Sequence, residues 1–306
     1  LGQTVSHDTL RGGRVKLKWY ATDSLDFTLS GTYEEAATAG GLASEGTDPA
    51  AVLCAICTPD PAYDYVVASN VPSKLRTRRH VIAGNMNWDL PYFTTKVIVS
   101  DQYLVVPYGF GDLDYTSAPL LEGEVGKQYA EQKTAEIRFE SNDDTPYSER
   151  LTWVVGGYYL ESAGGYDPLR LNIGSDALGF LSTNPLLGSV VDLLETLLPG
   201  VPDLINNVDV TLASYGVLGT ESASVFAEGS FNIVERLDAT VGLRYDEETR
   251  GVVGSKVEIL LPGEAAIPFS SFEVPETTTT RVSPRASLKW QFDNAQIYAS
   301  YAIGYL

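Results

Sequence analysis

The sequence predicts an all-β fold: an antiparallel transmembrane β-barrel of about ten strands, with long loops at one end and short turns at the other. Three observations predict this fold. Apolar and polar residues alternate in segment after segment, many segments are about nine to twelve residues long, and their connections alternate between short and long. Strands of soluble sheets usually have about five or six residues, whereas a tilted strand needs about 9–11 residues to cross a bilayer.

The strands are predicted from a period of two in the pattern of apolar residues. This period is most regular at 237–245, where Leu237, Val241 and Leu243 share one face and Arg244 lies on the other. Such a pattern indicates a strand with two different faces. Equally regular patterns predict strands at 14–20, 25–33, 135–141, 285–292 and 296–305. Less regular patterns predict strands at 80–88, 92–103, 151–160 and 222–232.

The connections between these strands predict which end of the barrel is which. Short connections lie at 21–24, 89–91, 234–236 and 293–295, with a somewhat longer one at 142–149. Long connections lie at 34–79, 104–130, 161–221 and 249–279. Barrels of the bacterial outer membrane have short periplasmic turns and long extracellular loops. We therefore expect an outer-membrane protein with its long loops outside the cell.

The alternation alone does not say which face is inside. The basic residues of the polar face decide, because an Arg or Lys that faces lipid at mid-membrane costs about 2–4 kcal/mol. Our candidates for lumen-facing residues are Lys16, Arg138, Arg244 and Lys289. This placement requires a lumen that is wide and wet, or one that is filled by a polar plug. A soluble sheet would instead need a second layer over its apolar face.

Aromatic residues near the predicted strand ends suit the aromatic girdles at the two membrane interfaces. These residues are Trp19, Tyr20, Tyr33, Trp88, Tyr92, Phe93, Tyr158 and Tyr159. Ordinary β-propensity also favours aromatic residues in strands, so no single one of them decides the interpretation.

Composition limits the other possible partners and membrane segments of the chain. The formal net charge of −19 over 306 residues makes nucleic acid an unsuitable partner. No apolar run of 18 residues predicts a transmembrane helix. The first residues do not resemble a signal peptide, and the last ones stop inside a strand pattern. We therefore expect residues 1–306 to be a partial barrel domain from within a longer chain.

One predicted helix lies in a long loop, at 184–200. Asn184 is a suitable N-cap, Pro185 occupies the first helical position, and Pro199 with Gly200 ends the segment. Such a helix either packs its apolar stripe on neighbouring loops or offers a docking surface.

Two cysteines, Cys54 and Cys57, lie in the first long loop. In an exported protein this pair predicts a disulfide that staples the loop. Free or metal-bound thiols and a redox role are the alternatives. A zinc site would need two further ligands, and no histidine lies nearby in the sequence.

Few residues favour enzymatic chemistry. His80 follows the basic segment 75–79 at the start of a strand. This arrangement predicts a basic rim that faces solvent or lipopolysaccharide. No Ser–His pair with an orienting group accompanies it. We therefore predict that the protein is not an enzyme and carries no metal or other cofactor.

Four segments resemble TonB-dependent receptors of the proteobacterial outer membrane. Residues 11–33 are similar to an early barrel hairpin of that family, and 135–162 to a mid-barrel hairpin. Residues 226–250 resemble a strand–turn–strand with "ERL" followed by "GLRY", and 281–306 resemble a segment with "SPR" followed by "YASYAIGY". The four segments occur in the family's order, and the likeness covers most strands from about residue 10 to 306. The loops carry none of it.

The resemblance implies a 22-stranded barrel with a plugged lumen, of which this sequence supplies about ten strands. It also implies active uptake of a scarce nutrient, for which a ferric siderophore is the leading candidate. The expected partners are membrane lipid, lipopolysaccharide and a TonB-type energy-transducing complex. That complex would act through a plug domain that is not recognisable in this sequence. The alternatives are a passive porin or structural outer-membrane protein without a plug, and a soluble β-sandwich binding module.

Overall fold

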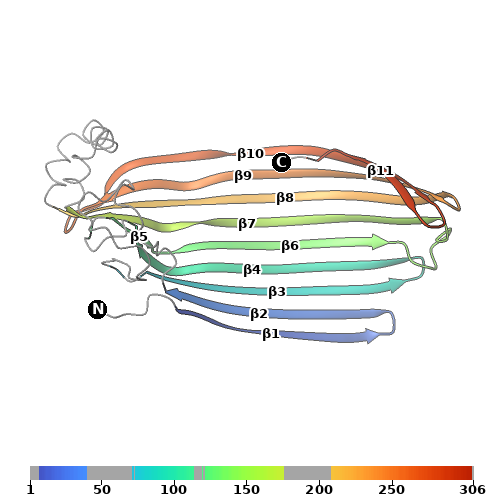
Figure 1. Ribbon diagram of the computed structural model, residues 1–306, viewed down its shortest axis with the longest axis horizontal. Helices are drawn as coiled ribbons and strands as arrows, with labels where there is room; N and C mark the ends of the chain where they lie inside the picture. Colours follow the sequence, from blue (N-terminus) through green and yellow to red (C-terminus); the bar gives the residue numbers. More distant parts are fainter. Residues whose placement is uncertain are drawn as a thin grey trace.

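The computed structural model describes residues 7–39, 71, 73–113, 119, 121–175 and 208–304. These residues form one antiparallel sheet of eleven strands, drawn in Figure 1. The strands are β1 (His7–Thr22), β2 (Leu25–Ala39), β3 (Lys74–Leu90), β4 (Phe93–Asp112), β5 (Leu121–Val125), β6 (Gln128–Glu140), β7 (Leu151–Ile173), β8 (Val210–Val234), β9 (Leu237–Leu260), β10 (Ile267–Gln291) and β11 (Gln296–Ala302). The predicted helix at 184–200 and the pair Cys54 and Cys57 lie outside the described residues.

The strands are ordered in the sheet almost as they are in the chain. Sequence neighbours pair antiparallel from β1 at one side to β11 at the other, except that β5 does not pair with β6. The short strand β5 and the longer β6 are successive segments at one position in the sheet, since both pair with β4 and with β7. The sheet is therefore an up-and-down meander, the arrangement of outer-membrane barrels. All ten predicted strands are present within it.

The connections predicted to be short lie at one end of the sheet and those predicted to be long at the opposite end, although the connection between β9 and β10 is itself short, at 261–266. The turns after β1, β3, β6, β8 and β10 all lie at one end, on the right in Figure 1. Two of these turns are linked directly: the side-chain nitrogen of Asn142 donates to the carbonyl of Leu90 at 2.8 Å. We call this end of the sheet the turn end and the opposite one the loop end.

The strands run much further toward the loop end than predicted. The loop expected at 249–279 is wrong for most of its length, because β9 continues to Leu260 and β10 begins at Ile267. β5 likewise lies within the loop expected at 104–130. Beyond Tyr245 the alternation of apolar residues ends, so the sequence loses its signal there. Backbone pairing does not depend on that alternation, and the ladder between β9 and β10 continues.

One face of the sheet, the apolar face, carries large apolar side chains that contact little protein. Val15, Val241 and Leu243 are 74%, 65% and 54% exposed. Few apolar side chains of the described residues are buried: Val106, Val210, Ala213, Ile259 and Leu261. An exposed apolar surface of this extent marks a face made for another apolar phase. No helix among the described residues is long and apolar enough to cross a membrane.

Two rows of aromatic residues border the apolar face. Near the turn end lie all four tryptophans of the chain, Trp19, Trp88, Trp153 and Trp290. The ring of Trp19 stacks on that of Phe27 with centroids 5.4 Å apart. Toward the loop end lie Tyr33, Tyr103, Tyr159 and Tyr245. Amphipathic rings in two rows are the girdles of a transmembrane barrel. Tyr20 and Tyr158, which we expected in the girdles, lie instead on the opposite face.

The girdles give the tilt of the strands. Following cross-strand partners from Tyr33 of β2 across six strand steps leads to Gly251 of β9. The tyrosine of β9 is Tyr245, six residues nearer the turn end. Six residues span about 20 Å along a strand and six steps about 29 Å across the sheet. The girdle therefore slants by about 35°, which is the strand tilt of outer-membrane barrels, about 35–45°.

Candidate functional site

The second face of the sheet, the polar face, carries all four residues predicted to face the lumen. Arg138, Gly156, Phe226 and Arg244 are successive cross-strand partners on β6 to β9. Because paired residues point to the same side of a sheet, both arginines lie opposite the apolar Leu243. The same register places Lys289 beside Asp238 and Lys16 beside Ser30.

Arg138 and Arg244 line one hollow, which has a volume of about 780 Å³. Its polar lining includes Glu136, Arg138, Glu140, Glu228, Arg244 and Arg285. A second hollow of about 530 Å³ follows toward the turn end and includes Lys289. A third, of about 420 Å³, includes Gln102 and Gln132. Lys16 lines none of the three. The polar face is thus hollowed along its length rather than packed.

Ion pairs neutralise most of the bases that line the polar face. Arg244 donates from Nε to Asp246 Oδ1 at 2.7 Å, and Lys289 lies 2.9 Å from Asp238 Oδ2. The other pairs are Arg138 with Glu136, Lys96 with Glu140 at 2.6 Å, and Arg285 with Glu228 at 3.0 Å. The acids are less exposed than their bases in each of these pairs. The hollows are therefore strongly polar but close to electrically neutral.

Arg244 also lies against two aromatic rings. Its guanidinium carbon is 5.9 Å from the ring centroids of both Tyr158 and Phe226. Gly156 makes room for this arrangement, because a Cβ there would lie 2.5 Å from the Phe226 ring. Sequence reasoning missed Phe226 and assigned Tyr158 to a girdle. Their even numbering, in register with Arg138 and Arg244, was the available signal.

Two buried polar atoms near Arg244 have no hydrogen-bond partner among the described residues. They are Asp246 Oδ2 and Ser224 Oγ, and the two residues are cross-strand partners. Asp246 is 3% exposed and Ser224 5%. Buried polar groups in native proteins almost always have a partner. The chain itself covers both atoms, and the other carboxylate oxygen of Asp246 accepts from Arg244.

Elsewhere on the polar face, neutral side chains bond across the strands. Ser100 pairs with Thr134 at 2.7 Å, and the amide of Gln102 donates to Gln132 Oε1 at 2.8 Å. Near the turn end Ser230 pairs with Thr240 at 2.7 Å. These contacts satisfy the polar face without an apolar core. The described residues hold no cluster of three metal-binding side chains.

His80 lies on the other side of the sheet, on the apolar face. Its Nε2 is 4.0 Å from Asp101 Oδ1, and its ring lies 5.5 Å from that of Tyr103. It therefore belongs to the girdle near the loop end rather than to the hollows.

The fold is similar to that of a solved outer-membrane receptor. The crystal structure of the ferric yersiniabactin uptake receptor FyuA from Yersinia pestis aligns with a TM-score of 0.60 at 12% identity. The alignment covers 95% of this chain and 37% of FyuA, so this chain spans little more than a third of that receptor. The translocator domain of the autotransporter NalP from Neisseria meningitidis aligns over 99% of this chain and 84% of NalP, with a TM-score of 0.18 and 8% identity. No curated protein sequence matches this chain.

The sequence itself matches a family model. The model is described as TonB dependent receptor-like, beta-barrel, and it matches residues 6–306. That match spans nearly the whole chain and includes every strand of the sheet. The chain therefore belongs to the TonB-dependent receptor family of outer-membrane β-barrels.

Proposed function

We propose that this chain is part of the barrel domain of a receptor that takes up a scarce nutrient across the bacterial outer membrane. A TonB-type complex would supply the energy through a plug region outside this sequence. In this arrangement the apolar face contacts lipid and the polar face lines the lumen, with Lys16, Arg138, Arg244 and Lys289 directed inward. The turn end then lies in the periplasm and the loop end outside the cell.

The hollowed polar face, which lies opposite the apolar face, is the observation that carries this proposal. A barrel that is merely embedded in lipid needs no hollowed face that is lined by ion pairs. The 22-stranded transporters of the outer membrane have a plugged lumen. A polar plug would pack against the hollow that Arg138 and Arg244 line.

We propose a ferric siderophore as the substrate. The similar structure of FyuA is that of a ferric yersiniabactin uptake receptor, which supports this class of compound. At 12% identity the likeness extends to the fold and not to a particular siderophore. The hollows are close to electrically neutral. This fits a lumen in which the plug, rather than net charge, selects the substrate.

A passive porin is the second candidate, because the row of polar hollows also suits a water-filled channel. Energy dependence separates the two functions. The test is growth of a deletion strain, complemented with the full-length receptor, on a panel of ferric siderophores in iron-limited medium. Active uptake predicts that growth on one siderophore is lost on deletion and also in a strain without the energy-transducing complex. Growth that persists without that complex would establish the porin, and growth unaffected by the deletion on every siderophore would refute iron uptake.

A further inference from the structure

A cluster of basic residues lies on the apolar face, just beyond the girdle near the loop end. We call Arg11, Lys74, Arg76 and Arg78 the basic rim. Arg11 and Arg78 are both cross-strand partners of Glu35, one on β1 and one on β3. Arg76 and Lys74 follow Arg78 on the same side of β3. Because paired residues share a face, the whole rim lies on the side of Tyr33 and Leu29.

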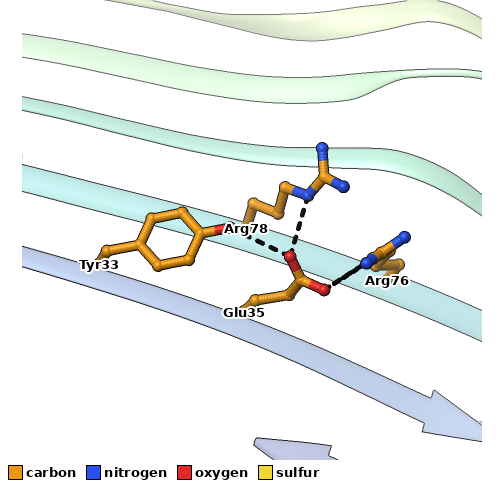
Figure 2. A network of polar contacts seen from close by, with 4 residues as sticks. All are labelled: Tyr33, Glu35, Arg76 and Arg78. Carbon is orange, nitrogen blue, oxygen red and sulfur yellow. Dashed lines mark hydrogen bonds and ion pairs between the residues drawn. The ribbon is translucent and has the colours of Figure 1, made fainter. Parts of the chain in front are cut away.

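Glu35 holds two of these arginines in place, as Figure 2 shows. Arg76 donates to Oε1 from both Nε, at 3.0 Å, and Nη2. Arg78 donates from Nε to Oε2 at 3.2 Å, and the hydroxyl of Tyr33 donates to the same oxygen at 3.0 Å. The hydrogen bonds from Arg76 and then Tyr33 lower the pKa of Glu35, which lies beyond the membrane-spanning segment.

This network leaves donors available to a further anion. Arg78 uses only Nε on Glu35, and its two terminal nitrogens point away from the carboxylate (Figure 2). The Arg76 and Arg78 side chains are 47% and 43% exposed, while Glu35 is 18% exposed. The rim holds four bases beside one acid, of which only Arg76 and Arg78 bond to Glu35, so it keeps a positive charge. Oriented guanidinium groups are suited to phosphate, which they bind through two parallel hydrogen bonds.

The position of the rim matches a lipid headgroup. Glu35 is two residues beyond Tyr33 of the girdle, about 7 Å along the strand. Headgroup phosphates lie at that level, next to the apolar band. Below the rim, Gly13 and Gly31 have open space where a side chain would stand. Together with Val15 and Leu17 they give an apolar strip that an acyl chain can cover.

The charge on this side of the barrel is exceptional for the chain. The protein has a formal net charge of −19. At the same level on the apolar face, β7, β8 and β9 carry Glu161, Glu221 and Glu247. A phosphorylated lipid would be repelled there and attracted to β1–β3. The basic rim therefore lies on one side of the barrel, the side formed by β1–β3.

We propose that the basic rim binds the phosphate of a phosphorylated glycolipid of the outer leaflet, with the lipid's acyl chains on the strip beside Val15 and Leu17. The proposal rests on the membrane placement of the barrel. Arg76 and Arg78 hold the phosphate, and Glu35 positions both arginines. Binding at this one place would fix lipid to β1–β3 and leave the acidic side of the barrel without it.

The test measures binding of bisphosphorylated lipid A to the full-length receptor in detergent by native mass spectrometry. Arg76→Gln with Arg78→Gln should weaken binding by about tenfold or more, because two charge-assisted contacts are lost. Arg79→Gln is the matched control, since Arg79 is the next residue, lies on the polar face and pairs with Glu34. It should change binding less than about twofold. Intact folding of the variants is checked by the shift of unheated samples on a gel.

Two further probes identify the ligand. Dephosphorylated lipid A should bind no better to the wild type than to the double variant, and inorganic phosphate alone should bind weakly. Equal binding of phosphorylated and dephosphorylated lipid would overturn the proposal, as would an equal loss in Arg79→Gln. Inorganic phosphate that binds as strongly as the lipid would show a free-anion site and overturn the lipid assignment. Siderophore-dependent growth of the double variant tests the uptake function separately, because it should be retained even when the lipid is lost.

Discussion

A lysine placed at Val241 should destabilise the barrel far more than a lysine at the adjacent Thr240. Val241 is the central apolar residue of β9, four residues from both Leu237 and Tyr245 at the girdles. That separation is about 14 Å along the strand, or about 11 Å across the bilayer at a tilt of about 35°. Val241 therefore lies at the midplane with its side chain 65% exposed.

The expected cost follows from this depth. A lysine facing lipid at the midplane costs about 2–4 kcal/mol, which lowers the ratio of folded to unfolded protein by a factor of about 30 to 1,000. Thr240→Lys places the same charge on the polar face, beside a hollow. It loses only the hydrogen bond to Ser230, about 1 kcal/mol.

Reversible urea unfolding of the full-length receptor in lipid vesicles measures both variants. The emission of the girdle tryptophans reports whether the barrel is inserted. A midpoint that falls further for Val241→Lys than for Thr240→Lys supports the assignment of the two faces. The opposite order would refute it, because Thr240 would then be the residue in contact with lipid.

Three other predictions concern separate parts of the chain. Gly242→Val should lower the unfolding free energy by about 1–3 kcal/mol, because its Cβ would lie 3.0 Å from both Arg285 and Glu228, which form an ion pair across β9. Gly13→Val has open space around it and should cost less in the same urea titration. Because the pKa of Glu35 is lower in the folded protein than its unfolded value near 4.5, the ionised Glu35 stabilises the fold at pH values above 4.5. This contribution is lost as the pH falls through the lower folded pKa. Unfolding followed between pH 5 and 3 should show a smaller acid dependence in Glu35→Gln than in the wild type, and equal slopes would contradict the network. Cys54 and Cys57 should react with maleimide only after reduction, and labelling of the native protein would show free thiols.

The sequence predicts the two faces of the sheet well, because bilayer and lumen impose opposite preferences on alternate residues. Leu243 and Arg244 illustrate this: neighbours in sequence, they lie on opposite faces of β9. The same physics explains the failure beyond Tyr245. Outside the membrane both faces of a strand meet polar surroundings, so the alternation ends while backbone pairing continues to Leu260.

The hollows were predictable only in part. The bases Arg138 and Arg244 were found because a charge has few places to go in a membrane. Phe226 was missed because an aromatic ring on the polar face carries no such penalty, and its position over Gly156 depends on the pairing of β7 with β8. The ion pairs with Glu136 and Asp246 follow from short spacings within one strand, which single-sequence patterns do not distinguish from solvated charges.

The long strands set where the receptor meets its surroundings. β9 continues for 15 residues beyond Tyr245, which is about 50 Å along the strand and about 40 Å from the bilayer at the same tilt. β9 pairs with β8 and β10 over this length, so this part of the protein is a continuous wall of paired strands rather than a set of separate loops. If the loop end lies outside the cell, as we propose, a molecule enters well above the lipid surface. Sugars, antibodies or phages at the cell surface would then encounter this wall before they reach the membrane.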